Sequence, residues 1–178
     1  MGFCFFNNVA VGIRHAQRHH GFSRVALVDF DVHHGNGSED ILAGDDEVLM
    51  VSTFQHPLYP YLGDVPKGVN MLNVPLPPRT RGDAMRRVVE ERWLPALEAF
   101  RPEIIFISAG FDAHRNDDMA SLNWVEADYA WLTARIVEVA DRHAEGRIVS
   151  VLEGGYELHA LARSVGAHVG VLLGAVDA

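Results

Sequence analysis

Two kinds of segment alternate along the chain, distinguished by how their hydrophobic and polar residues are spaced. Four long segments repeat apolar residues at helical spacing, starting near positions 9, 85, 125 and 158. The shorter segments are apolar almost throughout, as in strands that are covered on both faces, and they occupy residues 24–30, 47–53, 68–74, 103–108 and 147–152. This alternation predicts an α/β fold, in which right-handed crossovers connect a parallel β-sheet with helices on both faces.

Three local features refine this prediction. The first helix is expected to begin behind Asn7 and Asn8, which are favourable N-cap residues. Residues 55–69 are rich in Pro, Gly and Tyr and are too many for a simple connection, so we predict a functional loop there. Residues 1–6 lead directly into the first helix with no strand before it, and we therefore expect the chain to begin in the middle of a fold.

Length and charge limit the classes of function. A chain of 178 residues fits one domain with a sizeable core. Its 15 basic and 24 acidic residues give a net charge of −9, which argues against direct nucleic-acid binding, since that requires a basic surface. Cys4 is the single cysteine, so an internal disulfide is excluded and a reducing compartment is expected. Without an apolar run of membrane-spanning length or a signal-peptide pattern, we predict a cytoplasmic protein that does not bind membranes.

Acidic and histidine residues follow the predicted strands at the point where ligands bind in open α/β sheets. Asp31 and His33 lie two residues apart in extended chain, so their side chains point to the same side and can share one metal ion. A ligand from a second strand end would complete a catalytic zinc site that keeps a position open for water. The candidates for this third ligand are Asp112, Asp117 and Asp118.

The same residues allow three other interpretations. In the first, Asp29 and Asp31 only cap the strand end and His33 is structural. In the second, the Asp-x-Asp strand end belongs to a phosphatase of the haloacid dehalogenase type, which needs a lysine near the phosphate, whereas Lys67 is the single lysine and lies in the predicted loop. In the third, the site is an arginase-like two-metal centre, but Gly35 stands where a further carboxylate ligand is required. The last two are disfavoured.

Four motifs together resemble those of the histone deacetylase superfamily. They are GFCFFNN (2–8), VDFDVHHGNG (28–37), SAGFDAHRNDD (108–118) and LEGGY (152–156), in matching order and spacing. Their form is that of bacterial and class II members, a group similar to acetylpolyamine amidohydrolases and acetoin utilization proteins. The resemblance covers nearly the whole chain. It implies one catalytic domain over residues 1–178 with an arginase-like three-layer αβα fold, incomplete at the N-terminus because the catalytic His-His pair of the family precedes the first motif.

The resemblance also implies an activity and its residues. It implies a zinc-dependent hydrolase that removes an acetyl or other acyl group from acyl-lysine or acylpolyamine, with one Zn²⁺ per chain. Tyr156 matches the tyrosine that stabilises the oxyanion, and Asp29 matches the acid that orients a catalytic histidine. The matching zinc ligands are Asp31, His33 and Asp117. In the family a proline follows the third ligand, and Asp118 takes its place here.

Further positions are implied in the same way. A structural K⁺ or Na⁺ ion matches a site formed by Asp29, Asp31, His33, Ser52 and Thr53. Aromatic walls and a glycine floor of the acyl-lysine tunnel match Phe3, Tyr59, Gly154 and Gly155. The alternative to a working enzyme is a truncated, metal-binding but inactive chain, or a part completed by another subunit, and an oligomer is compatible with either. A long exposed apolar edge beside residues 24–30 would favour a fragment.

Overall fold

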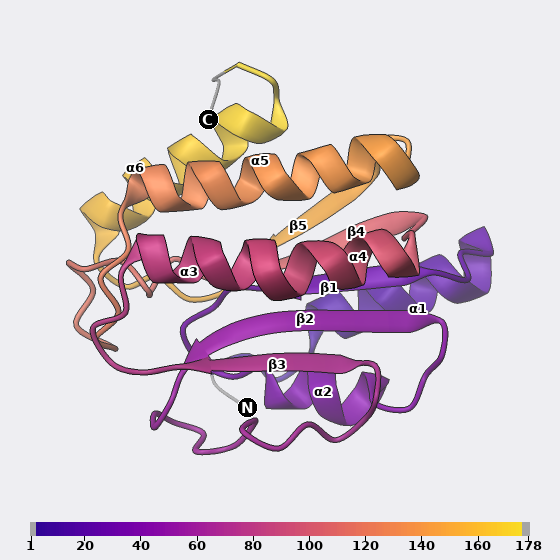
Figure 1. Cartoon of the computed structure of the whole chain (residues 1–178), viewed down its shortest axis with the longest axis horizontal. Coiled ribbons are helices and arrows are strands. Elements are labelled where there is room, and N and C mark those ends of the chain that lie inside the picture. The colour runs from indigo at the N-terminus through magenta and orange to yellow at the C-terminus, as the bar shows by residue number, and fades with distance from the viewer. Residues whose placement is uncertain (1–2, 176–178) are drawn as a thin grey trace.

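Five parallel strands form one sheet in the computed structural model, which describes residues 3–175 (Figure 1). Their order across the sheet is β3-β2-β1-β4-β5. The α/β fold and all five predicted strands are confirmed, and the strands span β1 (Val25–Asp29), β2 (Val48–Gln55), β3 (Met71–Leu76), β4 (Ile104–Ala109) and β5 (Ile148–Leu152). Because all neighbours are parallel, the carboxyl ends of the strands meet at one edge of the sheet.

The four predicted helices are also present. The first is α1 (Asn8–His20), and the Asn7 side chain accepts a hydrogen bond from Ala10 N (2.9 Å), which confirms the expected cap. The second is formed by three consecutive segments with a π-helical turn in the middle. The remaining elements in chain order are α2 (Asn36–Leu42), α3 (Gly82–Val88), η1 (Val89–Trp93), α4 (Leu94–Phe100), α5 (Glu126–His143) and α6 (Leu158–Leu172). Only α2 was not predicted, because its seven mostly polar residues carry too little helical periodicity.

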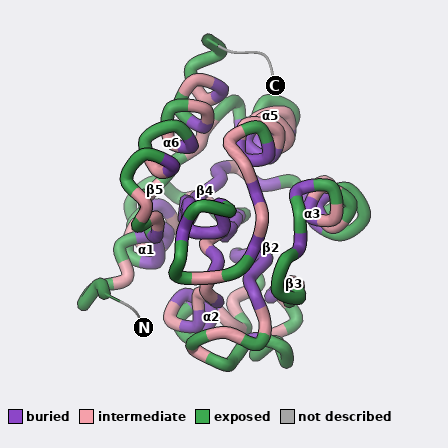
Figure 2. Tube along the Cα trace, turned by 90° about the vertical axis from the view of Figure 1, so that its left-hand side faces the viewer, coloured by how far each residue is buried: buried purple, intermediate pink, exposed green. Residues whose placement is uncertain are grey.

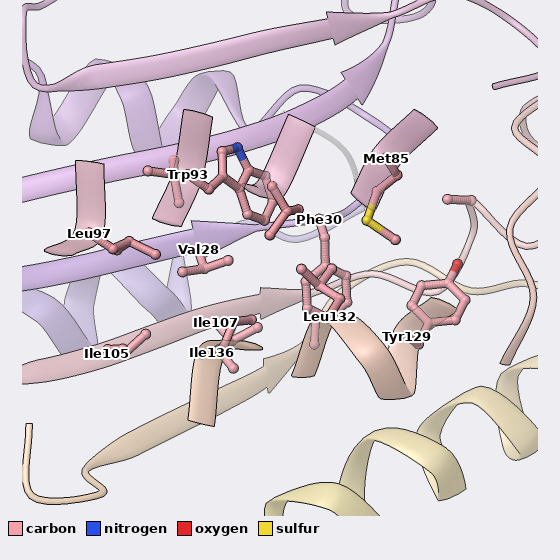
Figure 3. Packing of buried hydrophobic residues seen from close by; sticks show 14 of the residues in the cluster. Val28, Phe30, Met85, Trp93, Leu97, Ile105, Ile107, Tyr129, Leu132 and Ile136 are labelled. Carbon is pink, nitrogen blue, oxygen red and sulfur yellow. The ribbon is translucent and has the colours of Figure 1, made fainter. Parts of the chain in front are cut away.

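Helices cover both faces of the sheet and create two apolar cores. On one face, α3, η1, α4 and α5 pack their apolar sides against alternate residues of β1 and β4, with α6 beside α5. Figure 3 shows this larger core, in which Trp93 and Leu97 from the helices meet Val28 and Ile107 of the sheet. On the other face, α1 and α2 cover the intervening positions of the strands. The three-layer arrangement leaves the loops after β1, β4 and β5 together at one end.

The edge strand β5 differs from the prediction that every strand is covered on both faces. Val149 and Leu152 are 40% and 58% exposed, and β5 has a neighbour on one side only (Figure 2). The exposed apolar edge that would favour a fragment is not found beside residues 24–30, because β1 lies in the centre between β2 and β4; in the described residues, exposed apolar side chains occur on the edge strand β5 instead. None of the helices in residues 3–175 is long and apolar enough to cross a membrane.

A buried histidine connects α5, α6 and β5. Thr133 Oγ1 donates its proton to Tyr129 O (2.6 Å), so it accepts from His168 Nδ1 at 2.7 Å. This fixes the proton of the imidazole on Nδ1 and leaves Nε2 to accept from the Ser150 hydroxyl at 2.9 Å. Burial among these neutral partners lowers the pKa of His168 to about 4.

This histidine makes the fold sensitive to acid. In the unfolded chain His168 takes up a proton near its ordinary pKa of about 6.5, whereas the folded chain resists protonation down to about pH 4. The contribution of neutral His168 to the free energy of unfolding is therefore fully present above pH 6.5. It is lost as the pH falls from 6.5 to 4, and the loss is on the order of 1–3 kcal/mol. We expect His168→Asn to lose less unfolding free energy between pH 7.5 and 4.5 than the natural chain, measured by urea denaturation. His159→Asn, on the exposed side of α6, is the control and should keep the natural pH dependence.

Candidate metal centre

The register of β1 and β4 positions the polar residues that follow these strands. Asp29 pairs with Ser108 in the parallel ladder. His33 and Asp112 each follow this pair by four residues, so they reach the same level beyond the edge of the sheet. Asp31 lies two residues before His33 and contacts its ring, and Gly154, just after β5, approaches from the other side of β4. Three strand ends thus build one site.

Asp31, His33 and Asp112 form a compact group of potential metal ligands. His33 Nδ1 lies 3.1 Å from Asp31 Oδ1 and 3.2 Å from Asp112 Oδ2. In the described part of the chain this is the one group of three or more such residues whose ligand atoms lie within 4.8 Å of one another. Zinc ligands at 2.0–2.2 Å and tetrahedral angles are separated by about 3.3 Å, close to the spacing seen here.

The backbone closes tightly around the two carboxylates. Gly154 N donates to Asp31 Oδ2 (2.8 Å), and Val32 N donates to Asp112 Oδ1 (3.0 Å). A Cβ atom at Gly154 would collide with Asp112 Oδ2, and one at Gly110 would collide with Asp31. Asp112 Oδ2 is buried and lies 3.2 Å from His33 Nδ1. One oxygen of Asp112 is thus fixed by the backbone, while the other faces the His33 imidazole.

The pKa values of the group reflect the burial and mutual repulsion of its carboxylates. Burial and then the neighbouring charge of Asp31 raise the pKa of Asp29 well above its usual range and that of Asp112 to about 6. Burial alone would lower the pKa of His33, but its hydrogen bonds to Asp112 and Asp31 raise it to about 10. Desolvation and the charge of Asp31 also raise the pKa of Glu153. A bound divalent cation would relieve this crowding of carboxylates.

The structure groups Asp112, and not Asp117, with Asp31 and His33. Asp117 Oδ2 accepts from the backbone N–H groups of Tyr156 (2.6 Å) and Glu157 (3.1 Å), and Oδ1 accepts from Met119 N (3.1 Å). These bonds turn the Asp117 carboxylate away from His33 and toward the loop after β5. The expectation that Asp117 joins Asp31 and His33 is therefore corrected. Asp112 was one of the three candidates from the sequence, and the β1–β4 register is the signal that would have selected it.

Tyr156 lies next to the metal-ligand group. Its backbone position is held by the bond to Asp117, and its side chain is 40% exposed. Burial, and then the charges of Asp112 and Asp31, raise the pKa of Tyr156 to about 12, so the phenol keeps its proton at neutral pH. The Phe3 ring stands edge-on to the Tyr156 ring at 5.9 Å. Phe3 and Tyr156 are therefore neighbours, and the role of Phe3 as a tunnel wall stays a prediction.

The other three predicted tunnel residues, Tyr59, Gly154 and Gly155, lie in different surroundings. Gly154 faces the two carboxylates, whereas Gly155 has a φ of +138° and packs its Cα side against Leu161 and Phe111. Tyr59 is 46% exposed in the loop between β2 and β3, and its role in the tunnel stays a prediction. Gly2, at the start of the first motif, lies outside the described residues.

The predicted monovalent-cation site also stays a prediction, with two supporting features. Asp29 pairs with Ser52 in the sheet register, so their side chains are neighbours. The hydroxyl oxygens of Ser52 and Thr53 are buried without hydrogen-bond partners in residues 3–175. Gly35 approaches Asp29 so closely that any side chain there would strike its carboxylate.

One buried pair near the site was missed by sequence reasoning. His34 Nε2 lies 2.8 Å from Glu39 Oε2, and both residues are buried. Glu39 Oε1 accepts from Lys67 N (3.1 Å) and from Asn73 Nδ2 (2.8 Å), which ties the loop between β2 and β3 to α2. The His34 ring also packs on Phe54. Glu39 lies five residues after His34 in the unpredicted helix α2, so the sequence carried no signal for this contact.

The donor set fits a catalytic zinc ion. Two carboxylates and one imidazole would provide three ligands, the number found in catalytic zinc sites, and Tyr156 is close enough for the charges of Asp112 and Asp31 to raise its pKa. The site also has the enclosing backbone that orients such ligands. Lys67, which a phosphatase would need near the phosphate, pairs instead with Asp40.

The comparisons of the sequence with known proteins agree with one another. The sequence model described as the histone deacetylase domain matches residues 1–172. The chain is 45% identical over 180 residues to "Histone deacetylase 14, chloroplastic" of Arabidopsis thaliana, covering 98% of this chain and 43% of that protein. It is 44% identical over 164 residues to the "Histone deacetylase-like amidohydrolase" of Pseudomonas aeruginosa, covering 88% of this chain and 43% of that protein.

The fold agrees with a solved structure from the same group. The crystal structure of the HDA15 HD domain superposes with a TM-score of 0.91 at 33% sequence identity. The superposition covers 100% of this chain and 52% of that chain. The chain thus spans about half the length of the relatives it matches.

The choice between Asp112 and Asp117 leads to a direct test. We expect Asp112→Asn to weaken Co²⁺ binding by at least about 100-fold, because loss of a ligand should cost no less than loss of an outer hydrogen-bond partner. Asp117→Asn should change the affinity by less than about tenfold, since its carboxylate holds backbone and does not face the metal. The Co²⁺ affinity of each variant is measured by titration, followed by the visible Co²⁺ spectrum. Circular dichroism confirms that both variants are folded. A larger loss in Asp117→Asn would restore Asp117 as the ligand.

Proposed function

The chain belongs to the histone deacetylase family, and from this we propose that it forms the metal-binding part of a zinc-dependent amide hydrolase. The proposed reaction removes an acetyl or other acyl group from an acylated lysine or polyamine. The observation that carries the proposal is the Asp31–His33–Asp112 group beside Tyr156. Deacetylase and amidohydrolase names among the relatives support the reaction class.

The residues of the site divide the chemistry between them. A bound zinc ion would polarise the amide carbonyl and lower the pKa of a water molecule. Asp31 and Asp112 are held in the orientation that ligation requires by Gly154 N and Val32 N. The Tyr156 phenol, protonated at neutral pH, donates to the oxygen on which negative charge develops, an interaction that strengthens toward the transition state.

The general base is proposed to come from polypeptide that packs against this chain. The His34 imidazole contacts the buried Glu39 carboxylate through Nε2 (2.8 Å), and His114 Nδ1 accepts a hydrogen bond from Asn116 N (3.1 Å). The His19–His20 pair lies at the end of α1, before the amino end of β1, whereas the metal ligands follow the carboxyl end. These imidazoles are therefore poorly placed to take a proton from water at the site.

The exposed edge strand β5 favours a second candidate function, a metal-binding part that becomes active only with further polypeptide. Its outer edge has no neighbouring strand among residues 3–175, and its apolar side chains Val149 and Leu152 are exposed. Such an edge is a template for pairing with another strand. The partial coverage of the relatives supports the same view.

The role of Tyr156 is tested by Tyr156→Phe. We expect zinc content to stay near one ion per chain, because the hydroxyl is not a proposed ligand. The kcat for a fluorogenic acetyl-lysine substrate should fall about 10²–10³-fold, since one oxyanion donor is lost. Zinc is measured by mass spectrometry and kcat in whichever form of the protein is active. Unchanged kcat would remove Tyr156 from the mechanism.

The two candidate functions are separated by comparing the chain alone with a fusion that carries the amino-terminal part of the Pseudomonas aeruginosa relative ahead of it. We expect both proteins to bind zinc and only the fusion to hydrolyse acetyl-lysine, because the base lies on the added part. The same fusion with Asp112→Asn is the control and should be inactive. Activity of the chain alone would favour the self-sufficient enzyme. Absence of zinc from both proteins would contradict the proposed site.

A further inference from the structure

We propose that α1 carries a second metal site, formed by His15 and His19, which binds a divalent late transition ion such as Ni²⁺, Cu²⁺ or Zn²⁺. The two imidazoles lie four residues apart on one exposed face of a 13-residue helix. This spacing brings neighbouring turns together and is the spacing at which helical histidine pairs bind zinc. The histidine-rich end of α1 thereby acquires a function of its own, separate from catalysis.

The two rings are stacked with an interplanar angle of 30°, and their separation lies within the range for two imidazoles on one metal ion. The His15 and His19 ring centroids are 4.6 Å apart, and His20 lies 5.2 Å from His15. With metal–nitrogen distances of 2.0–2.1 Å, ring centroids lie roughly 3.2 Å from the ion, and two rings at angles of 90–110° are about 4.5–5.2 Å apart. His15 and His19 can therefore chelate one ion once their side chains rotate out of the stacked arrangement, and the site is proposed as a pair because His20 does not join them in a group of three ligands among the described residues.

The surroundings favour a cation despite nearby arginines. His19 and His20 lie in the last turn of α1, where the helix dipole places partial negative charge. Arg14 is paired with Asp45, so its charge is compensated. Arg18 is exposed and free to turn toward solvent. Imidazole is a preferred ligand of Ni²⁺, Cu²⁺ and Zn²⁺ and a poor one for Mg²⁺ or Ca²⁺, which defines the class of ion.

This site is remote from the Asp31–His33–Asp112 group. Helix α1 ends at His20, before β1 begins at Val25, whereas the catalytic candidates follow the carboxyl end of the same strand. The two sites therefore lie at opposite ends of β1, and they share no residue. A consequence is that the chain takes up a second equivalent of metal when zinc is in excess.

The experiment is calorimetric titration of the chain with Ni²⁺ after loading with one equivalent of Zn²⁺. We expect one Ni²⁺ site in the natural chain, and His15→Ala and His19→Ala should each weaken it by about tenfold or more because one of two chelating ligands is lost. His159→Ala, an exposed histidine on α6, is the matched control and should bind as the natural chain does. Alanine is the strongest helix former, so these exposed substitutions preserve α1.

A second measurement identifies the ligands directly. The electron paramagnetic resonance spectrum of bound Cu²⁺ should show coupling to two imidazole nitrogens in the natural chain and in His159→Ala, and should lose it in the His15→Ala/His19→Ala double variant. Unchanged Ni²⁺ affinity in the double variant, or an equal loss in His159→Ala, would overturn the proposal. Because no catalytic residue is changed, the outcome is independent of deacetylase activity.

Discussion

The site depends above all on the parallel pairing of β1 with β4. This ladder places Asp29 opposite Ser108 and thereby brings His33 and Asp112 to the same level beyond the sheet. Two carboxylates and an imidazole then lie about one metal-ligand spacing apart. A shift of one residue in this register would turn the side chains of one strand end to the opposite face of the sheet and disperse the group.

Bringing like charges together has an energetic cost, which the structure reduces in two ways. Backbone N–H groups of Gly154 and Val32 donate to the carboxylates, and these bonds stabilise the ionised forms. Burial, and then the neighbouring charge of Asp31, raise the pKa values of Asp29 and Asp112, which favours protonated carboxyl groups whose protons a divalent cation would displace. Glycine at positions 110 and 154 is required because the backbone approaches the carboxylates too closely for a Cβ atom.

Apolar side chains are exposed at the edge of the sheet and beside Tyr156. Central strands β1 and β4 are buried along their whole length, whereas β5 exposes apolar side chains at the edge of the sheet. The Phe3 side chain, which contacts Tyr156, is itself 80% exposed. Both the edge of the sheet and the surface beside Tyr156 therefore present apolar side chains to solvent.

The sequence by itself determined the five strands, the four longer helices, the family and the Asp31–His33 pair, because these depend on periodicity and on residues close together in the chain. The short helix α2 and the His34–Glu39 pair were not predictable, since the seven mostly polar residues of α2 carry no clear period. Only the tertiary structure decided between Asp112 and Asp117, five residues apart in one loop. That choice depends on strand register and on which backbone N–H groups the loop meets, and both arise from contacts between segments distant in sequence.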